Sequence, residues 1–204
     1  LVGSEMCIRD RDVGAVGAKL LYSDDTVQHA GVVIGYNGLA GHTFVGNEPD
    51  DVGYRAYVIQ ARDYSAVTAA CLMVKASLYD EVGGFEEELE VAFNDVDLCY
   101  KIYEEGYYNV VRNDLFLFHH ESLSRGKDGE SEEKQLRLLR EKDYLYEKHQ
   151  DLYGRDPFYH PYLTTDMLET EYTPAFRYQV DLSMPWAKVK KCTQEVLAAR
   201  EDEC

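Results

Sequence analysis

The sequence predicts a mixed α/β fold built as one unit, and three observations lead to it. Short apolar runs rich in β-branched residues end at turn residues, which is typical of buried strands. Between them, apolar residues recur at three- and four-residue steps, as in amphipathic helices. The chain has 204 residues, 45% of them apolar, and no internal repeat or low-complexity linker divides it. One hydrophobic core shared by strands and helices is therefore expected.

The first third of the chain predicts strands and a long loop. Residues 13–22, VGAVGAKLLY, are mostly small or β-branched and stop at the turn-rich SDDT, so they predict a buried strand. Residues 26–38 predict a second strand, closed by an Asn-Gly pair. Residues 39–63 are rich in Gly, Asp and Asn and show little periodicity. They predict a long loop, and loops of that length in compact domains usually carry function or move.

The middle of the chain predicts a strand and two helices. Residues 64–85 change from a continuous apolar run to a helical spacing and stop at a glycine pair. They predict a strand, a short helix and a glycine turn. From Asn94 onward, apolar residues recur at three- and four-residue steps as far as Gly106. This pattern predicts an amphipathic helix with Asn94 as its N-cap and Gly106 as its C-cap.

The last part of the chain predicts two strands, a charged helix and a coil. Residues 107–111 and 115–120 are strand-like and are separated by turn residues. Residues 131–150 are strongly charged with leucines and tyrosines among the charges, so they predict a solvent-facing helix. Residues 156–185 hold four of the five prolines and predict irregular coil, and residues 186–200 predict a last helix.

Charge and cysteine content exclude several classes of protein. The formal net charge is −17, whereas proteins that bind nucleic acid backbones or anionic membranes need clustered Lys and Arg. The five cysteines are widely spaced without a CxxC pair, so neither a disulfide framework nor a zinc site is expected. No apolar run approaches the roughly 20 residues of a transmembrane helix, and the first residues lack the pattern of a signal peptide. The sequence predicts a globular protein of the reducing cytoplasm that binds no nucleic acid.

Two aspartates, Asp95 and Asp97, lie within the largely apolar stretch VAFNDVDLC. Behind an Asn94 cap they fall at the first and third helical positions, where carboxylates suit the partial positive charge of a helix N-terminus. That account needs no function. A carboxylate in this position, beside a glycine-permitted opening, can also take a proton from a hydroxyl as a general base. Two residues apart on a helix, the two side chains point about 200° apart, so they would chelate one metal ion poorly.

The stretch FLFHHESLSRG ends an apolar strand with His119 and His120. Successive side chains of a strand face opposite sides, so only one of these histidines can line a given cleft. A histidine at a strand end is more often a structural hydrogen-bonding group than a ligand. Arg125 shifts that balance toward function, because its guanidinium fork suits phosphate oxygens.

Other motifs are weak or missing. His29 and His42 have no acidic partner at ligand spacing and are expected to be structural. The acidic triplets SDD (23–25) and PDD (49–51) are turn compositions. The sequence contains no GxGxxG, GxxxxGK or GxSxG motif, so a dinucleotide fingerprint, a P-loop and a nucleophile elbow are not supported.

Four blocks of the sequence carry a family likeness. They are VGAVGAKLLYSDDTVQHAGVVIG, SAVTAACLMVKASLYDEVGGFEEEL, VAFNDVDLCYKIYEEGYYNVV and LFLFHHESLSRG. Together, from about Val13 to about Gly126, they resemble the C-terminal half of family 2 glycosyltransferases, and most closely the rhamnosyltransferase-like type that builds O-antigen and cell-wall glycans. Four blocks in the family's order make this likeness far more specific than any single motif.

The resemblance implies a partial GT-A fold, a Rossmann-like α/β sandwich whose mixed sheet is flanked by helices, with an irregular C-terminal extension. Such enzymes transfer a sugar from a nucleotide-sugar donor to the hydroxyl of a glycan or lipid-linked acceptor, with inversion at the anomeric carbon. An acidic residue at a helix start deprotonates the acceptor. A divalent metal, Mg²⁺ or Mn²⁺, on the diphosphate stabilises the leaving group.

The resemblance also assigns roles to particular residues. The catalytic base falls on Asp95, with Asn94 where the family often has an acidic residue, and Asp97 becomes a supporting residue or helix cap. His119 matches a histidine that joins the metal or the diphosphate, and His120 is the alternative. The other binding assignments are an acceptor-side loop, small residues near the donor sugar and a diphosphate contact. The acceptor-side loop is Gly83, Gly84 and Phe85, the small residues near the donor sugar are Thr68, Ala69 and Ala70, and the diphosphate contact is Arg125.

The resemblance divides the chain into three parts. Residues 1–12 carry no information, residues 13–126 match the acceptor-side half of the catalytic domain, and residues 127–204 form a helical and Pro-rich extension. The family's N-terminal half, with the DxD motif that holds most of the metal, has no counterpart here. The chain is therefore expected to be a fragment that is incomplete as an isolated enzyme. A place in the cytoplasm, with peripheral association at the inner membrane face, is a further expectation.

Two other functions stay open. One is a metal-dependent hydrolase or phosphotransferase that uses Asp95, Asp97 and the histidines as ligands. The other is a carbohydrate-binding fragment without catalytic activity.

Overall fold

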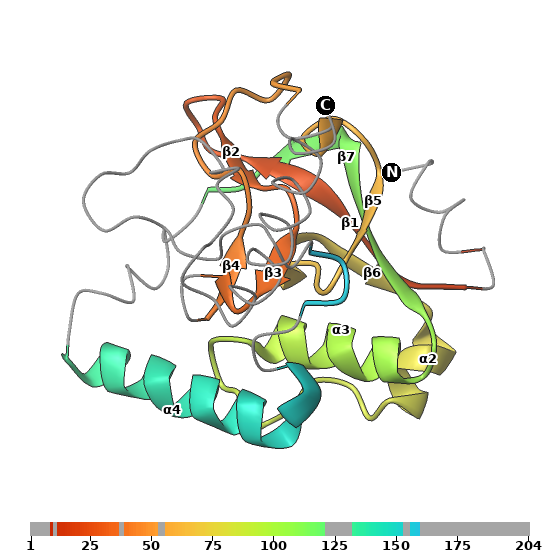
Figure 1. Ribbon diagram of the computed structural model, residues 1–204, viewed down its shortest axis with the longest axis vertical. Coiled ribbons are helices and arrows are strands. Elements are labelled where there is room, and N and C mark those ends of the chain that lie inside the picture. The colour runs from red at the N-terminus through yellow and green to blue at the C-terminus, as the bar shows by residue number, and fades with distance from the viewer. Residues whose placement is uncertain are drawn as a thin grey trace, which may run out of the picture.

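The structure, a computed structural model, describes residues 9, 12–36, 39–52, 56–120, 132–152 and 156–159. These residues form a mixed α/β fold, consistent with a partial Rossmann-like sandwich, as the sequence predicts (Figure 1). The strands are β1 (Val13–Leu21), β2 (Val27–His29), β3 (Val32–Ile34), β4 (Ala40–His42), β5 (Arg62–Tyr64), β6 (Leu72–Val74) and β7 (Tyr108–Phe118). The helices are η3 (Ala69–Cys71), α2 (Ala76–Glu81), α3 (Asn94–Glu104), α4 (Glu132–Lys148) and η5 (Gln150–Leu152).

The larger sheet is centred on β1 and β7, which run parallel to each other. On its other side β1 pairs antiparallel with β6 at one end and with β2 at the other. β5 pairs antiparallel with β7, and β3 and β4 form a separate two-stranded sheet. The central place of β1 explains its sequence, because a strand buried on both faces requires an almost continuous run of small and apolar residues.

Two glycines allow other segments to approach β1 closely. A Cβ atom at Gly14 would lie 2.3 Å from the Ile102 side chain of α3, and one at Gly17 would lie 2.0 Å from the Val67 side chain. Neither space can hold a methyl group. The small-residue character of β1 therefore lets α3 and the segment before η3 pack directly on the sheet.

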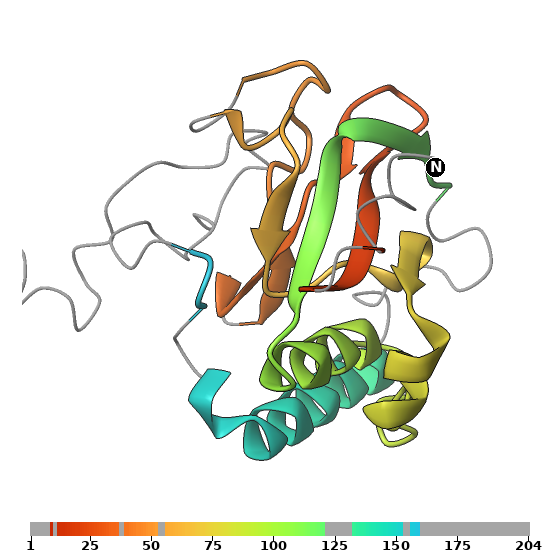
Figure 2. The same cartoon turned by 90° about the vertical axis from the view of Figure 1, so that its right-hand side faces the viewer.

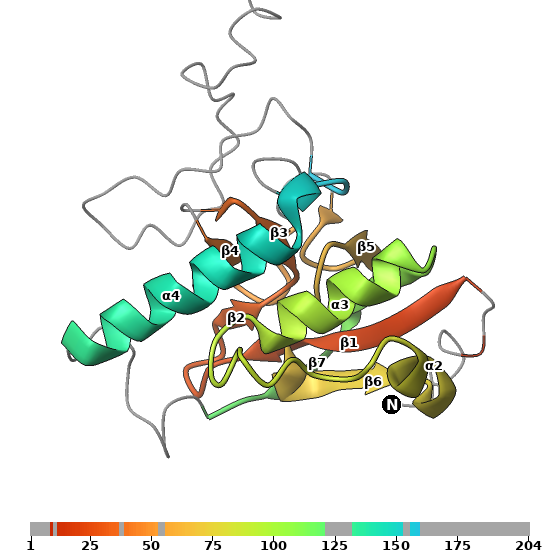
Figure 3. The same ribbon diagram turned by 90° about the horizontal axis from the view of Figure 1, so that it is seen from below.

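The helices α3 and α4 lie side by side on one side of the sheet (Figures 2 and 3). α3 buries Leu98 and Ile102 against Ala15 of β1 and Leu78 of α2. α4, predicted as solvent-facing, is mainly exposed, but Leu145 is buried in the main core. None of the helices in the described part of the chain has the length and apolar character needed to cross a membrane.

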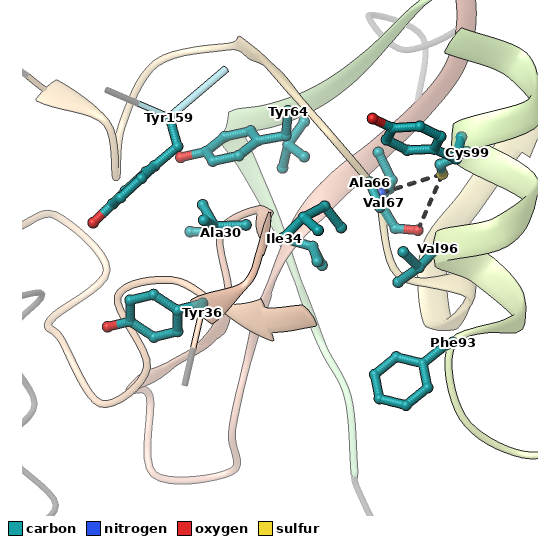
Figure 4. Packing of buried hydrophobic residues seen from close by; sticks show 14 of the residues in the cluster. Ala30, Ile34, Tyr36, Tyr64, Ala66, Val67, Phe93, Val96, Cys99 and Tyr159 are labelled. Atoms are coloured by element: carbon teal, nitrogen blue, oxygen red, sulfur yellow. Dashed lines mark hydrogen bonds between the residues drawn. The ribbon is translucent and has the colours of Figure 1, made fainter. Parts of the chain in front are cut away.

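The main core lies between the two sheets and α3. Figure 4 shows Ile34 of β3, Tyr64 of β5 and Val96 of α3 among its side chains. Cys99 is fully buried there, and its Sγ accepts a hydrogen bond from the Val67 amide at 3.3 Å. Burial raises the pKa of this thiol to about 12, so Cys99 is an inert core residue.

In its described parts, residues 39–52 and 56–63, the predicted long loop is confirmed, apart from the short strands at its two ends. Lys19 on β1 is buried, and its Nζ donates to the carbonyl oxygens of Pro49 (2.6 Å) and Val58 (3.0 Å). Burial lowers the pKa of this ammonium group, and the two carbonyls compensate part of its desolvation. One lysine of the central strand thus fastens the loop to the sheet.

The structure corrects two strand predictions. Residues 26–38 are not one strand, because the chain turns at Gly31 (φ +125°), so β2 joins the large sheet and β3 joins β4. Conversely, the runs 107–111 and 115–120 form one strand and not two, since β7 is continuous over Tyr108–Phe118. The predicted turn at Asn113 and Asp114 is a bulge, because the register against β1 jumps from Arg112 to Phe116.

The start of α3 also differs from the prediction. Asn94 is not the cap but the first helical residue, and the capping position is occupied by Phe93 in the left-handed region (φ +61°) without a side-chain cap. Asp95 and Asp97 therefore stand at the second and fourth helical positions. The C-terminal end is confirmed, since Gly106 has φ +87° just after Glu105. The coil and last helix predicted beyond residue 159 lie outside the described residues.

The strongest link between α3 and α4 is the buried carboxylate of Asp97. Its Oδ1 lies 2.8 Å from Lys148 Nζ and 2.8 Å from His149 Nε2, and its Oδ2 lies 3.1 Å from Lys101 Nζ. Asp97 is completely buried. Burial alone would raise its pKa, but the hydrogen bonds from His149, Lys148 and Lys101 outweigh it and lower the pKa to about 2.

We predict that Asp97→Asn destabilises the protein by about 3 kcal/mol near neutral pH, because the cations are left without their buried partner. The pKa of Asp97 is lower in the folded than in the unfolded state. Its stabilisation is therefore present above about pH 4 and is lost as the pH falls toward 2, a loss of about 2 kcal/mol. Denaturant unfolding at several pH values should show the gap between wild type and variant narrowing over that interval.

Asp143→Asn is the matched control for this prediction. Asp143 pairs with Lys142 at 3.4 Å, but its side chain is 69% exposed, so its loss should change stability by less than about 0.5 kcal/mol. A gap between wild type and Asp97→Asn that stays constant from neutral pH to pH 2 would contradict the proposed linkage.

Candidate functional site

A cleft of about 660 Å³ opens beside the N-terminus of α3. Its walls come from the ends of β1 and β7, from β2 to β4 with the chain just after β4, from the start of η3 and from the segment that leads into α3. The lining residues are Leu20, Tyr22, Gln28, Val32, Ala40, His42, Val45, Thr68, Ala69, Ala70, Val91, Ala92, Phe93, Asn94, Asp95, Val96 and His119. The cleft therefore gathers segments that are far apart in the sequence.

Asp95 is held in this cleft by backbone groups. Its Oδ2 accepts a hydrogen bond from the Ala69 amide at 2.9 Å, and its Oδ1 accepts one from the Val96 amide at 2.9 Å. The carboxylate is half-buried at the second position of α3, where the helix N-terminus stabilises negative charge. Each oxygen keeps further lone pairs, so the group can accept a proton or another hydrogen bond.

Thr68, Ala69 and Ala70 line the cleft next to Asp95. The Thr68 hydroxyl accepts a hydrogen bond from the Ala70 amide at 3.4 Å and so caps the short helix η3. The resulting turn directs the Ala69 amide at the carboxylate of Asp95. The small side chains of the two alanines leave room in the cleft. The structure thus brings Thr68, Ala69, Asn94 and Asp95 together at one cleft.

His119 lines the same cleft, whereas His120 does not. The Nδ1 atom of His119 lies 2.8 Å from Oε1 of Gln28, and the Gln28 amide nitrogen donates to the His119 carbonyl at 3.3 Å. His120 is exposed, and its Nδ1 lies 2.9 Å from the Ser23 hydroxyl. Of the two neighbouring histidines only one faces the cleft, in agreement with the alternation expected at a strand end.

His42 is a further cleft residue that sequence reasoning left as structural. Its Nδ1 lies 3.2 Å from Nδ1 of His29, and the two rings meet edge to face with their centroids 4.8 Å apart. His29 is completely buried, and this burial, together with His42, lowers its pKa well below the ordinary value. Neither His42 nor Gln28 carries a motif. Only the pairing of β3 with β4 and of β2 with β1 brings them to the cleft.

The remaining predicted site residues lie elsewhere. Gly83 and Gly84 form the turn after α2 with φ of +79° and +66°, and the Gly84 carbonyl accepts a hydrogen bond from Lys101 Nζ at 2.5 Å. Phe85 is 42% exposed, and its amide donates to the Tyr79 hydroxyl at 3.2 Å. None of the three lines the cleft that holds Asp95. Arg125 lies outside the described residues.

The donor set for a metal is incomplete in the described part of the chain. No group of three His, Cys, Asp or Glu side chains there is arranged to hold a metal ion. His119 is a single candidate ligand, and Asp97 is unsuitable because its oxygens face Lys101, Lys148 and His149. These residues do not by themselves fit the Mg²⁺ or Mn²⁺ ion that the sequence resemblance implies.

Comparisons with known proteins give three informative matches. The chain is 46% identical over 155 residues to the uncharacterized protein y4gI of Sinorhizobium fredii, which covers 76% of the chain and 17% of that protein. It is 36% identical over 161 residues to the O-antigen biosynthesis protein RfbC of Myxococcus xanthus, covering 75% of the chain and 12% of that protein. Over 62 residues it is 32% identical to N-acetylglucosaminyl-diphospho-decaprenol L-rhamnosyltransferase of Mycobacterium tuberculosis, covering 30% and 20%.

The first two matches each span most of this chain but less than a fifth of the longer relative. No protein-family model matches the chain. No solved structure matches it either. The chain is thus similar to segments of larger proteins, among them one named for O-antigen biosynthesis and one named for rhamnosyl transfer.

Proposed function

We propose that this chain is the acceptor-side part of an inverting GT-A glycosyltransferase of family 2, with Asp95 as the general base. The observation that carries the proposal is the position of Asp95. Its carboxylate is fixed by two backbone amides at a helix N-terminus and faces a cleft of about 660 Å³. A fixed carboxylate beside a cavity large enough for a sugar ring is what deprotonation of an acceptor hydroxyl requires.

The proposed reaction is a single displacement. The acceptor hydroxyl gives its proton to Asp95 as its oxygen forms a bond to the anomeric carbon of the donor sugar. The bond between that carbon and the phosphate oxygen breaks, and the nucleoside diphosphate leaves with the bonding electron pair. The anomeric centre is inverted. The amides of Ala69 and Val96 hold the Asp95 oxygens in place while the proton moves.

The relatives support the sugar chemistry. One is named for O-antigen biosynthesis and another for transfer of L-rhamnose to a diphospho-decaprenol-linked N-acetylglucosamine. For this chain we propose a nucleotide-sugar donor and a glycan or lipid-linked acceptor. We also propose that the boundary between the acceptor-side half and the extension lies near residue 126, and that the protein works at the cytoplasmic face of the membrane.

Binding of a divalent metal is a separate part of the proposal. His119 would be the ligand from this chain, with the other ligands supplied from outside the described residues. Such an ion supplies charge stabilisation for the departing diphosphate. Gly83, Gly84, Phe85 and Arg125 are proposed as acceptor and diphosphate contacts of the complete protein, since the cleft formed by the described residues does not include them.

The structure disfavours the alternative of a metal-dependent hydrolase or phosphotransferase. That reading needs Asp95 and Asp97 as ligands of one ion. Asp97 is completely buried against Lys148 and His149 and does not line the cleft, whereas Asp95 does. The two carboxylates serve separate environments, as their spacing on a helix predicts.

We predict that Asp95→Asn lowers the rate of sugar transfer by at least about 100-fold, because an amide cannot accept the proton of the acceptor hydroxyl. The assay is transfer by the longer polypeptide that carries the donor-binding half. Denaturant unfolding should show a loss of stability of only about 1 kcal/mol, because the amide oxygen still accepts one of the two backbone hydrogen bonds.

Asp80→Asn, on the exposed part of α2, is the control and should leave the rate of sugar transfer unchanged. Near wild-type transfer by Asp95→Asn would refute the assignment of the base.

We predict that His119→Ala weakens Mn²⁺-dependent binding of the nucleotide-sugar donor by about tenfold, the loss expected for one ligand or charge-assisted contact. Calorimetric titration of the donor with and without Mn²⁺ measures it. Binding of a glycan acceptor should change less. Donor binding with the same Mn²⁺ dependence in wild type and variant would exclude His119 from the metal site.

A further inference from the structure

Six consecutive residues, 91–96, form the longest continuous part of the cleft wall. They include Asp95 and lead from the preceding loop into the first turn of α3. The backbone path of this segment therefore decides both the shape of the wall and the direction of the Asp95 carboxylate. A group that fixes this path influences the proposed reaction without lining the cleft.

The path is set at Phe93, where the backbone is left-handed (φ +61°, ψ 5°). This conformation is costly for a residue with a bulky side chain, and it persists only where neighbouring contacts hold it. The Phe93 carbonyl oxygen accepts a hydrogen bond from the Asp97 amide at 2.9 Å, so Phe93 begins the helix that carries Asp95. The direction of the proposed base thus depends on an unfavourable backbone conformation that needs support from outside the segment.

Glu141 of α4 supplies that support. Its side chain is only 5% exposed, and its Oε2 accepts a hydrogen bond from the Ala92 amide at 2.6 Å. Ala92 directly precedes Phe93, so this bond fixes the chain one residue before the left-handed turn. A hydrogen bond to a carboxylate is stronger than one between neutral groups. The other oxygen, Oε1, lies 3.6 Å from Arg137 Nε, and this cation stabilises the charge of Glu141.

The helix α4 also holds the chain at both ends of this segment. Lys148 Nζ lies 2.5 Å from Glu86 Oε2, before the segment, and 2.8 Å from Asp97 Oδ1, after it. Leu89, between Glu86 and Phe93, is buried in the main core. Figure 3 shows α4 lying beside α3. None of the residues of α4 lines the cleft, yet the helix fixes the chain before, within and after the cleft wall.

We propose that Glu141 is a positioning residue for the transfer reaction: its hydrogen bond from the Ala92 amide holds Phe93 in the left-handed conformation and thereby aims the Asp95 carboxylate at the acceptor hydroxyl. This inference rests on the proposed function, because Glu141 acts through the proposed base. The proposed donor contacts, His119 and Arg125, lie on other segments of the chain. The loss of Glu141 should therefore slow the transfer step and leave donor binding intact.

The hydrogen bond itself can be measured on the 204-residue chain by amide hydrogen exchange. Glu141→Leu should speed exchange at the Ala92 amide at least about tenfold, because the amide loses its partner. Glu141→Gln should speed it less, since the amide oxygen of Gln can still accept the bond. The Leu98 amide, inside α3, is the internal reference and should keep its wild-type exchange rate. Equal exchange at Ala92 in wild type and Glu141→Leu would overturn the proposal.

The effect on the reaction is measured with the longer polypeptide that carries the donor-binding half. Glu141→Leu should lower kcat for sugar transfer at least about tenfold, because a small misplacement of a general base slows the reaction strongly, while the KM for the nucleotide-sugar donor stays the same. Glu141→Gln should recover most of kcat. Glu147→Leu, at an exposed position of α4, is the control and should match wild type. A lower unfolding midpoint with unchanged kcat would show a merely structural role and contradict the proposal.

Phe93→Asn tests whether Glu141 acts through the left-handed residue. Asn adopts the left-handed conformation at a lower cost than Phe, so in this background the chain depends less on Glu141. Glu141→Leu should then lower kcat only about twofold relative to Phe93→Asn alone, a coupling that is expected for two residues sharing one backbone constraint. The same tenfold loss in both backgrounds would refute the link through Phe93.

The proposed function and the role of Glu141 fail in different ways. If Asp95→Asn is nearly inactive but Glu141→Leu has the wild-type kcat, the base assignment stands and the role of Glu141 is wrong. If Asp95→Asn transfers sugar at the wild-type rate, the proposed base is wrong, and the role of Glu141 in aiming it is wrong as well. In that case the exchange rate at Ala92 still shows whether Glu141 holds the segment.

Discussion

The buried carboxylate of Asp97 is the interaction on which the arrangement of the site depends. Taking a charge out of water is costly, and Lys101, Lys148 and His149, which meet at this group, compensate the cost; Lys148 is the last residue of α4 and His149 follows it. This cluster fixes the first turns of α3 against α4. Asp95 stands two residues earlier on the same helix, so the carboxylate that faces the cleft is held by one that faces the interior.

The helix α4 supports the cleft at a second point. Glu141 is buried, and its carboxylate accepts a hydrogen bond from the Ala92 amide at 2.6 Å, in the segment that lines the cleft and leads into α3. The next residue, Phe93, has a left-handed backbone conformation (φ +61°), which is costly for a non-glycine residue. The hydrogen bond from the Ala92 amide to Glu141 helps to hold the chain in that conformation. The charges of α4 predict a solvent-facing helix, but two of its charged side chains, Glu141 and Lys148, support the segment and the helix that line the cleft.

The cleft gathers several side chains that can donate or accept hydrogen bonds. One carboxylate, two imidazoles, a threonine and two amide side chains share a cavity of about 660 Å³. Each imidazole has a partner behind it, since Nδ1 of His42 lies 3.2 Å from Nδ1 of His29 and Nδ1 of His119 lies 2.8 Å from Oε1 of Gln28. Such pre-organisation suits recognition of a polar ligand, because the hydrogen-bonding groups are in place before the ligand arrives.

Several features were predictable from the sequence because they depend on local pattern. The central strand at 13–21, the helix that starts at Asn94 and the glycine turn after Glu81 follow from composition and spacing. The separation of Asp95 from Asp97 follows from helical geometry alone. The prediction of two strands on either side of Asn113 and Asp114 was wrong. These are turn residues by type, and only pairing with the continuous strand β1 keeps β7 together through the bulge.

The sequence by itself therefore determined the α/β class and the position of Asp95 at a helix start. Through strand alternation it also determined that only one of His119 and His120 could line a given cleft. Only the tertiary structure decided that Gln28 and His42 belong to the cleft, that Asp97 is a buried charge partner and not a cap, and that Gly83 to Phe85 lie outside the cleft. The physical reason is the distance along the chain over which each kind of interaction acts. Periodicity and capping act within a few residues, whereas the partners of Asp97 and His119 are 52 and 91 positions away along the chain.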